Sequence, residues 1–216
     1  MKRSYPFLVG VTGGLGSGKS AVCHFLAEMG CALFESDVVA KTLQLQDHEV
    51  IDGIQTLFGS EVYSFSDDGQ LLLDRKKIAA TVFSSSEKLA ALNALMHPKV
   101  AAAFCKAREL ANQQNRKILV KEAAILFESG GNVGLDAIVV VVADRDERIA
   151  RAVQKGMGTP EEIVRRMATQ WPQEKLIAQA DYLLLNKGSL AELKRETAAL
   201  FQKLLVAAEA VCGQVE

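Results

Sequence analysis

Four residues near the N-terminus have the types and the spacing of a phosphate-binding loop. Gly13, Gly18, Lys19 and Ser20 fit the pattern G-x-x-x-x-G-K-[S/T], here called the P-loop (residues 13–20). Glycines let backbone N–H groups approach phosphate oxygens closely, because no Cβ stands in the way. The lysine can reach the β- and γ-phosphates of a nucleotide, and the serine hydroxyl can ligate Mg²⁺. The pattern predicts binding of a nucleoside triphosphate, without saying what is done with it.

Two carboxylates follow or occupy expected strands and can serve the same site. Asp37 follows a short apolar run, residues 31–35, and precedes a helical pattern that starts near Val38. It is either an N-cap of that helix or a group that points toward the phosphates, and its position alone favours neither. Glu122 lies on an apolar run that we expect to continue toward Phe127, and its carboxylate can reach Mg²⁺ through water.

Many cations flank a turn that contains Gly156, Gly158 and Pro160. Such a run is usually the solvated face of a helix. After a P-loop it is also typical of a lid whose cations close over a triphosphate. We favour a lid region at residues 144–176, with the candidate cations Arg145, Arg148, Arg151, Lys155, Arg165 and Arg166.

The elements that must position these groups alternate between strands and helices. A strand, the P-loop, a helix at 19–29 that ends at Gly30, and a second strand form one β-α-β unit. A long amphipathic helix is expected at 190–211. The predicted fold class is α/β, a P-loop NTP hydrolase-type doubly wound parallel sheet. Its five expected strands are 7–12, 31–35, 117–120, 137–142 and 182–185.

Residues 47–115 interrupt this alternation, because helical patterns dominate there. A small hairpin is expected around Asp67-Asp68-Gly69. We interpret this stretch as a helical insertion that holds the acceptor substrate, with helices at 50–58, 75–83, 87–96 and 98–112, the last one starting at Pro98. The nucleotide-binding core then comprises residues 1–46, 116–143 and 177–216.

Composition excludes several classes of protein. The 216 residues carry a net charge of −1, which argues against broad binding to nucleic acid. No apolar run is long enough for a signal peptide or a membrane span, so we expect a soluble cytoplasmic protein. The cysteines form no C-x-x-C pair, which disfavours zinc and disulfides. We expect buried reduced thiols at Cys23, Cys31, Cys105 and Cys212.

Three functions are compatible with a P-loop. A GTPase is disfavoured because the segment Asn186-Lys187-Gly188-Ser189 lacks the carboxylate that reads guanine. A regulatory nucleotide-binding module would not need an acceptor region, a base and a lid together. A small-molecule kinase uses all three, and we favour it.

Motifs outside the P-loop point to one family of kinases. The run L73-D-R-K-K-I-A-A-T-V-F83 is followed by L92-N-A-L-M-H-P-K-V100, and I-L-F-E ends at Glu128. Asp37 falls on the second acid of a D-A-D-x-x-A motif. The segment R166-M-A-T-Q170, with Lys175, Ala180-Asp181 and Asn186, fits the C-terminal pattern. Over nearly its whole length the chain resembles dephospho-coenzyme A kinases.

The resemblance implies transfer of the ATP γ-phosphoryl group to the ribose 3′-hydroxyl of dephospho-CoA, with Mg²⁺ as cofactor and a monomer or weak homo-oligomer as the working unit. It implies catalytic roles for Asp37, Lys19 and Arg151, and a metal contact for Ser20. Acceptor contacts are expected from Asp37, Arg75, His97 and Glu128, although a structural role for His97 at a helix start stays open. Expected ATP contacts are Gly14, Leu15, Gly16, Ser17, Gly18, Lys19, Ser20, Ala21 and Asn186.

The chain departs from the family pattern at several positions. Glu35 and Ser36 replace the first acid and the alanine of D-A-D, and Ala124 replaces a proline. Glu122 stands where an aspartate is usual. Lys155 replaces an arginine of the lid, and a lysine cannot make the bidentate phosphate contact of an arginine.

Overall fold

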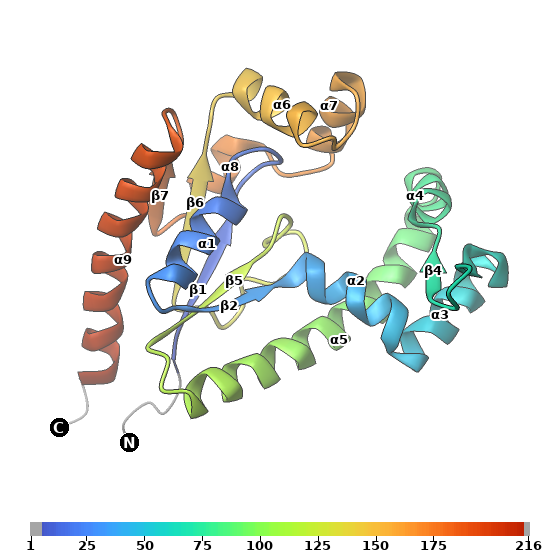
Figure 1. The fold of residues 1–216 in the computed structure, drawn as a ribbon, viewed down its shortest axis with the longest axis horizontal. Coiled ribbons are helices and arrows are strands. Elements are labelled where there is room, and N and C mark those ends of the chain that lie inside the picture. The colour runs from blue at the N-terminus through green and yellow to red at the C-terminus, as the bar shows by residue number, and fades with distance from the viewer. Residues whose placement is uncertain (1–5, 214–216) are drawn as a thin grey trace. The chain divides into compact units, whose positions relative to one another are not determined.

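The computed structural model describes residues 6–213, and the chain divides into two compact units (Figure 1). The first unit contains the residues up to Glu35 and those from Lys106 onward. The second unit is Ser36–Cys105. Each unit is described by itself below.

The first unit is built on a parallel five-stranded sheet with the strand order β2-β5-β1-β6-β7. The central strand β1 is buried at all six positions, and its first five residues are apolar or glycine, as expected for a strand covered on both faces. Strands β2 and β5 lie on one side of β1, and β6 and β7 lie on the other side. The end of β1 is therefore the topological switch point where α/β sheets bind ligands, and the predicted fold class is confirmed. The strands are β1 Phe7–Thr12, β2 Ala32–Glu35, β5 Ile118–Glu122, β6 Ala137–Val142 and β7 Tyr182–Leu185.

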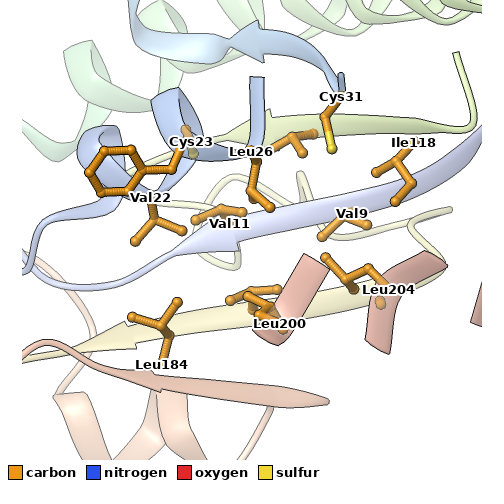
Figure 2. Close-up of a cluster of buried hydrophobic side chains, with 14 of the residues drawn as sticks. Val9, Val11, Val22, Cys23, Leu26, Cys31, Ile118, Leu184, Leu200 and Leu204 are labelled. Atoms are coloured by element: carbon orange, nitrogen blue, oxygen red, sulfur yellow. The ribbon is translucent and has the colours of Figure 1, made fainter. Parts of the chain in front are cut away.

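Two helices, α1 (Lys19–Glu28) and α9 (Leu190–Gly213), cover one face of this sheet. Figure 2 shows Leu26 of α1 and Leu204 of α9 packed with Val9 and Val11 of β1. Strand residues alternate between the two faces. Val140 and Val142 of β6 accordingly pack on the opposite face with Leu176 of the short helix α8 (Gln173–Ile177).

The core residue Leu204 provides a test of this packing, since it is fully buried between α9 and the sheet. We expect Leu204→Ala to lower the free energy of unfolding by about 2–5 kcal/mol, because it removes buried methyl groups and leaves a cavity. Leu190→Ala is the matched control on the same helix, where the side chain is 65% exposed. Its expected loss is below about 0.5 kcal/mol. Chemical denaturation followed by circular dichroism measures both, and equal losses would contradict the described core.

Three helices of the first unit lie between β6 and β7 in the sequence: α6 (Arg145–Gln154), α7 (Pro160–Ala168) and α8. Asp144 caps α6 by accepting a hydrogen bond from the Asp146 N–H. A capping box between Thr159 and Glu162 starts α7, with Pro160 at its first turn. These caps explain why the charged segment forms two separate helices.

The second unit is a helical unit with a small core. Its helices are α2 Ser36–Gln46, α3 His48–Phe58, α4 Arg75–Ser84 and the first part of α5 Ser86–Gln113. A 3₁₀ turn at Ser60–Val62 leads into the antiparallel hairpin of β3 Tyr63–Phe65 and β4 Leu71–Leu73. This hairpin confirms the one predicted around Asp67-Asp68-Gly69. The core residues are Val50, Ile54, Val62, Ile78 and Met96.

The structure excludes one of the two alternatives for Asp37, and one prediction about this helical segment is wrong. Helix α2 begins at Ser36, so Asp37 lies in its first turn and is not an N-cap. Strand β2 therefore leads straight into the helix. Helix α5 runs without a break through Pro98, where the sequence predicts a new helix. A proline removes one hydrogen bond of a helix interior, and the buried side chain of Met96 keeps this part of the helix packed in the core.

The predicted extension of the strand at 117–120 toward Phe127 is also wrong. Strand β5 ends at Glu122, and turns follow from Ala124 onward. Leu126 is fully buried while Ile125 is 41% exposed, so the apolar residues of this segment reflect partial burial of a turn. Strand β5 therefore ends at Glu122, and the loop starts with the next residue.

The cysteines are only partly as expected. Cys23 and Cys31 are free and buried, and burial raises the pKa of both thiols, that of Cys31 to about 12. Cys105 is free but exposed, contrary to the prediction, because it lies on an outer face of α5. The side chain of Cys212 lies outside the described residues. Within residues 6–213, no helix is both long and apolar enough to span a membrane.

Candidate active site

The P-loop connects β1 to α1 and takes a conformation that requires glycine. Gly16 and Gly18 have φ values of 76° and 102°, which side chains rarely tolerate. A Cβ on Gly16 would lie 2.2 Å from the carbonyl oxygen of Arg148, and one on Gly18 would lie 2.3 Å from Asn186 Nδ2. The glycines are thus needed for the turn and for the close approach of other segments.

Lys19 lies across its own loop and is buried, with 8% of its surface exposed. Its Nζ donates to the carbonyl oxygens of Gly13, at 2.8 Å, and Gly14, at 3.2 Å. These bonds hold the ammonium group against the loop, beside the N-terminus of α1. A buried cation and a helix N-terminus together favour an anion at this place.

Ser20 and Glu122 meet at the same edge of the sheet. The Ser20 hydroxyl donates to Glu122 Oε1 over 2.9 Å. Glu122 is paired with Val11 of β1 on one side and with Glu35 of β2 on the other. Hydroxyl and carboxylate oxygens are the ligands that Mg²⁺ prefers, usually with several waters and substrate phosphates. Among the described residues, no group of three or more His, Cys, Asp or Glu side chains is arranged to hold a metal ion.

Asn186, just after β7, supports the P-loop directly, and Arg151 of α6 contacts Asn186. Asn186 is buried, and its Nδ2 donates to the Ser17 carbonyl oxygen at 2.8 Å. Arg151 donates to the Asn186 carbonyl oxygen at 3.3 Å and pairs with Glu147 at 2.9 Å. The structure thus places both predicted residues next to the loop, with the Asn186 amide engaged in holding it.

Leu15 is contacted by two side chains from outside the P-loop, Arg148, which was expected as a lid cation, and Gln170, which was given no role. Its N–H donates to Gln170 Oε1 at 2.8 Å, and its carbonyl oxygen accepts from Arg148 Nε at 3.0 Å. Burial, with a contribution from Arg145, lowers the pKa of Arg148, although an arginine stays charged in proteins. The only sequence signals were the cation cluster for Arg148 and the family pattern for Gln170.

Glu128 is engaged with the segment that follows α7. Its Oε1 accepts from the Trp171 N–H at 2.8 Å. The Trp171 ring stacks on Phe127 with a centroid distance of 5.3 Å, and Lys175 Nζ lies 3.3 Å from its centroid. Glu128 therefore has a structural partner here, and its predicted acceptor contact stays a prediction.

The remaining predicted acceptor residues belong to the second unit. Arg75 starts α4 and donates to the side chain of Gln44 and the carbonyl oxygen of Lys41, both on α2. It therefore contacts the helix whose first turn carries Asp37. His97 is half-buried in the interior of α5. This position removes the helix-start role considered for His97.

A P-loop at the switch point of a parallel sheet, with Lys19, Ser20 and Glu122 gathered around it, defines an α/β protein of the P-loop kinase class. The family model described as Dephospho-CoA kinase matches residues 7–192. The chain belongs to the dephospho-CoA kinase family. That membership makes it an ATP-dependent phosphotransferase of coenzyme A biosynthesis.

Individual relatives agree with this assignment. The dephospho-CoA kinase of Chlorobium chlorochromatii is 59% identical over 95% of this chain and 97% of its own length. The crystal structure of TT1252 from Thermus thermophilus is 30% identical, with a TM-score of 0.77 over 93% of this chain and 98% of that one. A dephospho-CoA kinase structure from Campylobacter jejuni has a TM-score of 0.67 over the same shares at 21% identity, which supports the fold alone.

Proposed function

We propose that the chain transfers the γ-phosphoryl group of Mg²⁺-bound ATP to the ribose 3′-hydroxyl of dephospho-CoA. The oxygen of that hydroxyl forms a bond to the γ-phosphorus, the bond from phosphorus to the β–γ bridging oxygen breaks, and ADP leaves. The observation that carries the proposal is the buried ammonium of Lys19 beside the hydrogen-bonded Ser20 and Glu122 at the switch point of the sheet.

The P-loop holds the triphosphate in this proposal. The backbone N–H groups of Gly14, Gly16 and Gly18, with the Lys19 ammonium, neutralise the β- and γ-phosphates. The N–H groups of Leu15, Ser17 and Ala21 already donate to Gln170 Oε1 and to the carbonyl oxygens of Gly14 and Gly18, so their predicted contacts would require these bonds to be exchanged. Arg151 adds a cation from α6 and is already oriented by Asn186 and Glu147. The predicted contact of Asn186 with adenine would have to use atoms other than its Nδ2–H that bonds to Ser17.

Mg²⁺ fits the oxygen atoms of Ser20 and Glu122, which would hold it directly and through water. When bound, it neutralises charge that develops on the β- and γ-phosphate oxygens. The exposed position of Ser20 lets the hydroxyl turn from Glu122 to the cation without breaking the core.

The proposed acceptor contacts come from Asp37, Arg75 and His97 of the second unit and from Glu128 of the first. Asp37 accepts the proton of the 3′-hydroxyl and orients its oxygen toward the γ-phosphorus, with Arg75, His97 and Glu128 as further acceptor contacts. Asp37 follows β2 by two residues, and Glu35 at the end of β2 pairs with Glu122. Since every proposed group comes from one chain, we propose a monomer or weak homo-oligomer as the working unit, acting in the cytoplasm.

The direct test is an assay of ADP release with Mg-ATP and a panel of hydroxyl acceptors that includes dephospho-CoA. We expect ADP only with dephospho-CoA, and with ATP in preference to GTP. A protein that binds ATP but releases no ADP with any acceptor would be a binding module, and preferential hydrolysis of GTP without an acceptor would indicate a GTPase.

The metal contact has its own prediction. Ser20→Ala is expected to raise the Mg²⁺ concentration for half-maximal ADP release by about tenfold or more, because a metal-site partner is lost. A Mg²⁺ titration at fixed ATP measures this effect. Ser64→Ala, at an exposed position of β3, is the control and should leave the titration unchanged. Superimposable curves for Ser20→Ala and the control would remove Ser20 from the metal site.

A further inference from the structure

The Leu15 backbone is bonded on both sides by side chains that are distant in the sequence. Gln170 accepts from its N–H and Arg148 donates to its carbonyl oxygen, at sequence separations of 155 and 133 residues. Both side chains come from the region between β6 and β7: Arg148 from α6 and Gln170 from the residues just after α7. The P-loop is thus connected to the elements that were expected to form a lid.

These two bonds fix the peptide planes on either side of Leu15. A trans peptide is planar, and its C=O and N–H point in opposite directions. Holding the Leu15 carbonyl oxygen toward Arg148 turns the Gly16 N–H to the other side. Holding the Leu15 N–H toward Gln170 turns the Gly14 carbonyl away, to where the Ser17 N–H reaches it at 3.1 Å and Lys19 Nζ at 3.2 Å.

Because Leu15 lies between Gly14 and Gly16, hydrogen bonds from other segments can order the loop backbone strongly at this point. A glycine has more backbone freedom than any other residue, so ordering it costs more conformational entropy. Arg148 also fills the space beside these glycines. A Cβ on Gly14 would lie 1.9 Å from Arg148 Nη2, so the guanidinium lies directly against the loop backbone.

The two side chains are themselves held in place. Arg148 is 9% exposed, so its guanidinium has little room to leave the loop. Gln170 uses its second polar atom as well, since Nε2 donates to the Ala124 carbonyl oxygen at 3.1 Å. Ala124 follows Glu122 by two residues, so Gln170 joins the segment after the metal-site carboxylate to the P-loop.

We propose that Arg148 and Gln170 are positioning residues that hold the Leu15 peptide so that the Gly16 N–H faces the bound triphosphate. They act through the loop backbone, and Arg148 adds a fixed positive charge beside the loop. This proposal rests on the proposed binding of ATP at the P-loop. It makes the start of α6 and the residues just after α7 a fixed support of the loop, and leaves residues 155–168 as the part that can move as a lid.

The test compares ligand affinities of variants with their stability. Arg148→Met and Gln170→Leu keep the side-chain size and remove the polar contacts with Leu15. We expect each to raise the Kd of ATP about tenfold, the usual effect of one lost hydrogen bond to a charged or buried group. Isothermal titration calorimetry should show the Kd of dephospho-CoA nearly unchanged. The loss of ATP-binding free energy in the double variant should be smaller than the sum of the losses in the two single variants, because both side chains act on the backbone of Leu15.

Controls separate positioning from general loss of structure. Arg195→Met on α9 and Gln154→Leu on α6 make the same changes at exposed positions and should leave both affinities unchanged. Arg148→Lys keeps the charge but puts a methylene where arginine has Nε, and serves if Arg148→Met does not fold; a weaker ATP affinity is again expected. Thermal melting without ligand shows which variants are folded.

The outcomes are distinct. Unchanged ATP affinity in folded variants, or equal weakening of ATP and dephospho-CoA binding, would overturn the positioning role while leaving the proposed reaction intact. If the unsubstituted chain bound no ATP, the proposed function would fail and this inference with it.

Discussion

Asp37→Asn is expected to lower kcat by about 10²–10⁴-fold, the usual contribution of a general base. Asparagine has the size of aspartate and can occupy the first turn of α2, so the fold should be retained. It cannot accept a proton from the 3′-hydroxyl, so the nucleophile loses its activation. Binding of ATP should be nearly intact, because Asp37 is one of the proposed acceptor contacts from the second unit.

Steady-state assays of ADP release measure the kcat of Asp37→Asn, and calorimetry measures its Kd for ATP. Asp52→Asn is the matched control, because Asp52 is an exposed carboxylate on α3 of the same unit. We expect the control to retain full activity. Full activity of Asp37→Asn as well would falsify the proposed base.

Lys19→Ala is expected to weaken ATP binding and to lower turnover together. Lys19 is a buried cation whose bonds to Gly13 and Gly14 also close the loop, so its loss removes both a charge and a contact. A charged hydrogen bond contributes about 1.5–3 kcal/mol, which predicts about a 10- to 100-fold higher Kd for ATP. A further loss in kcat is expected, because the charge on the γ-phosphate increases toward the transition state.

Calorimetry with ATP and the ADP-release assay test Lys19→Ala side by side with Lys203→Ala, a control at an exposed position of α9. Lys19→Met retains the apolar stem and serves if the alanine variant is unstable. The account of the P-loop would be wrong if folded Lys19 variants kept the ATP affinity and rate of the control.

Strands with one dominant local signal could be predicted closely from the sequence. The strands β1, β6 and β7 have the expected bounds, because each is a run of apolar residues with clear ends. The errors occur where tertiary packing decides. Pro98 interrupts the local helical signal, yet α5 continues through it beside the packed residue Met96. The apolar residues after Glu122 resemble a strand, but they belong to a half-buried turn.

The residues of the site also fall into those that a local motif predicts and those that depend on tertiary packing. The P-loop residues follow one another in the chain, so a short motif predicts both Lys19 and Ser20. The partnership of Ser20 with Glu122 depends on the parallel pairing of β1 and β5, and no strand order was predicted from the sequence. The contacts of Arg148 and Gln170 with Leu15 depend on how α6 and α7 pack against the loop. No local pattern specifies that packing, so these contacts could not be predicted.

The most direct test of the proposed transfer uses ATP that carries ¹⁸O in its γ-phosphoryl group and asks which product contains the label. With dephospho-CoA and Mg²⁺, we predict that ADP and CoA form in equal amounts and that the label appears in the 3′-phosphate of CoA, as read by mass spectrometry. Label that appears only in inorganic phosphate, with dephospho-CoA unchanged, would contradict the account.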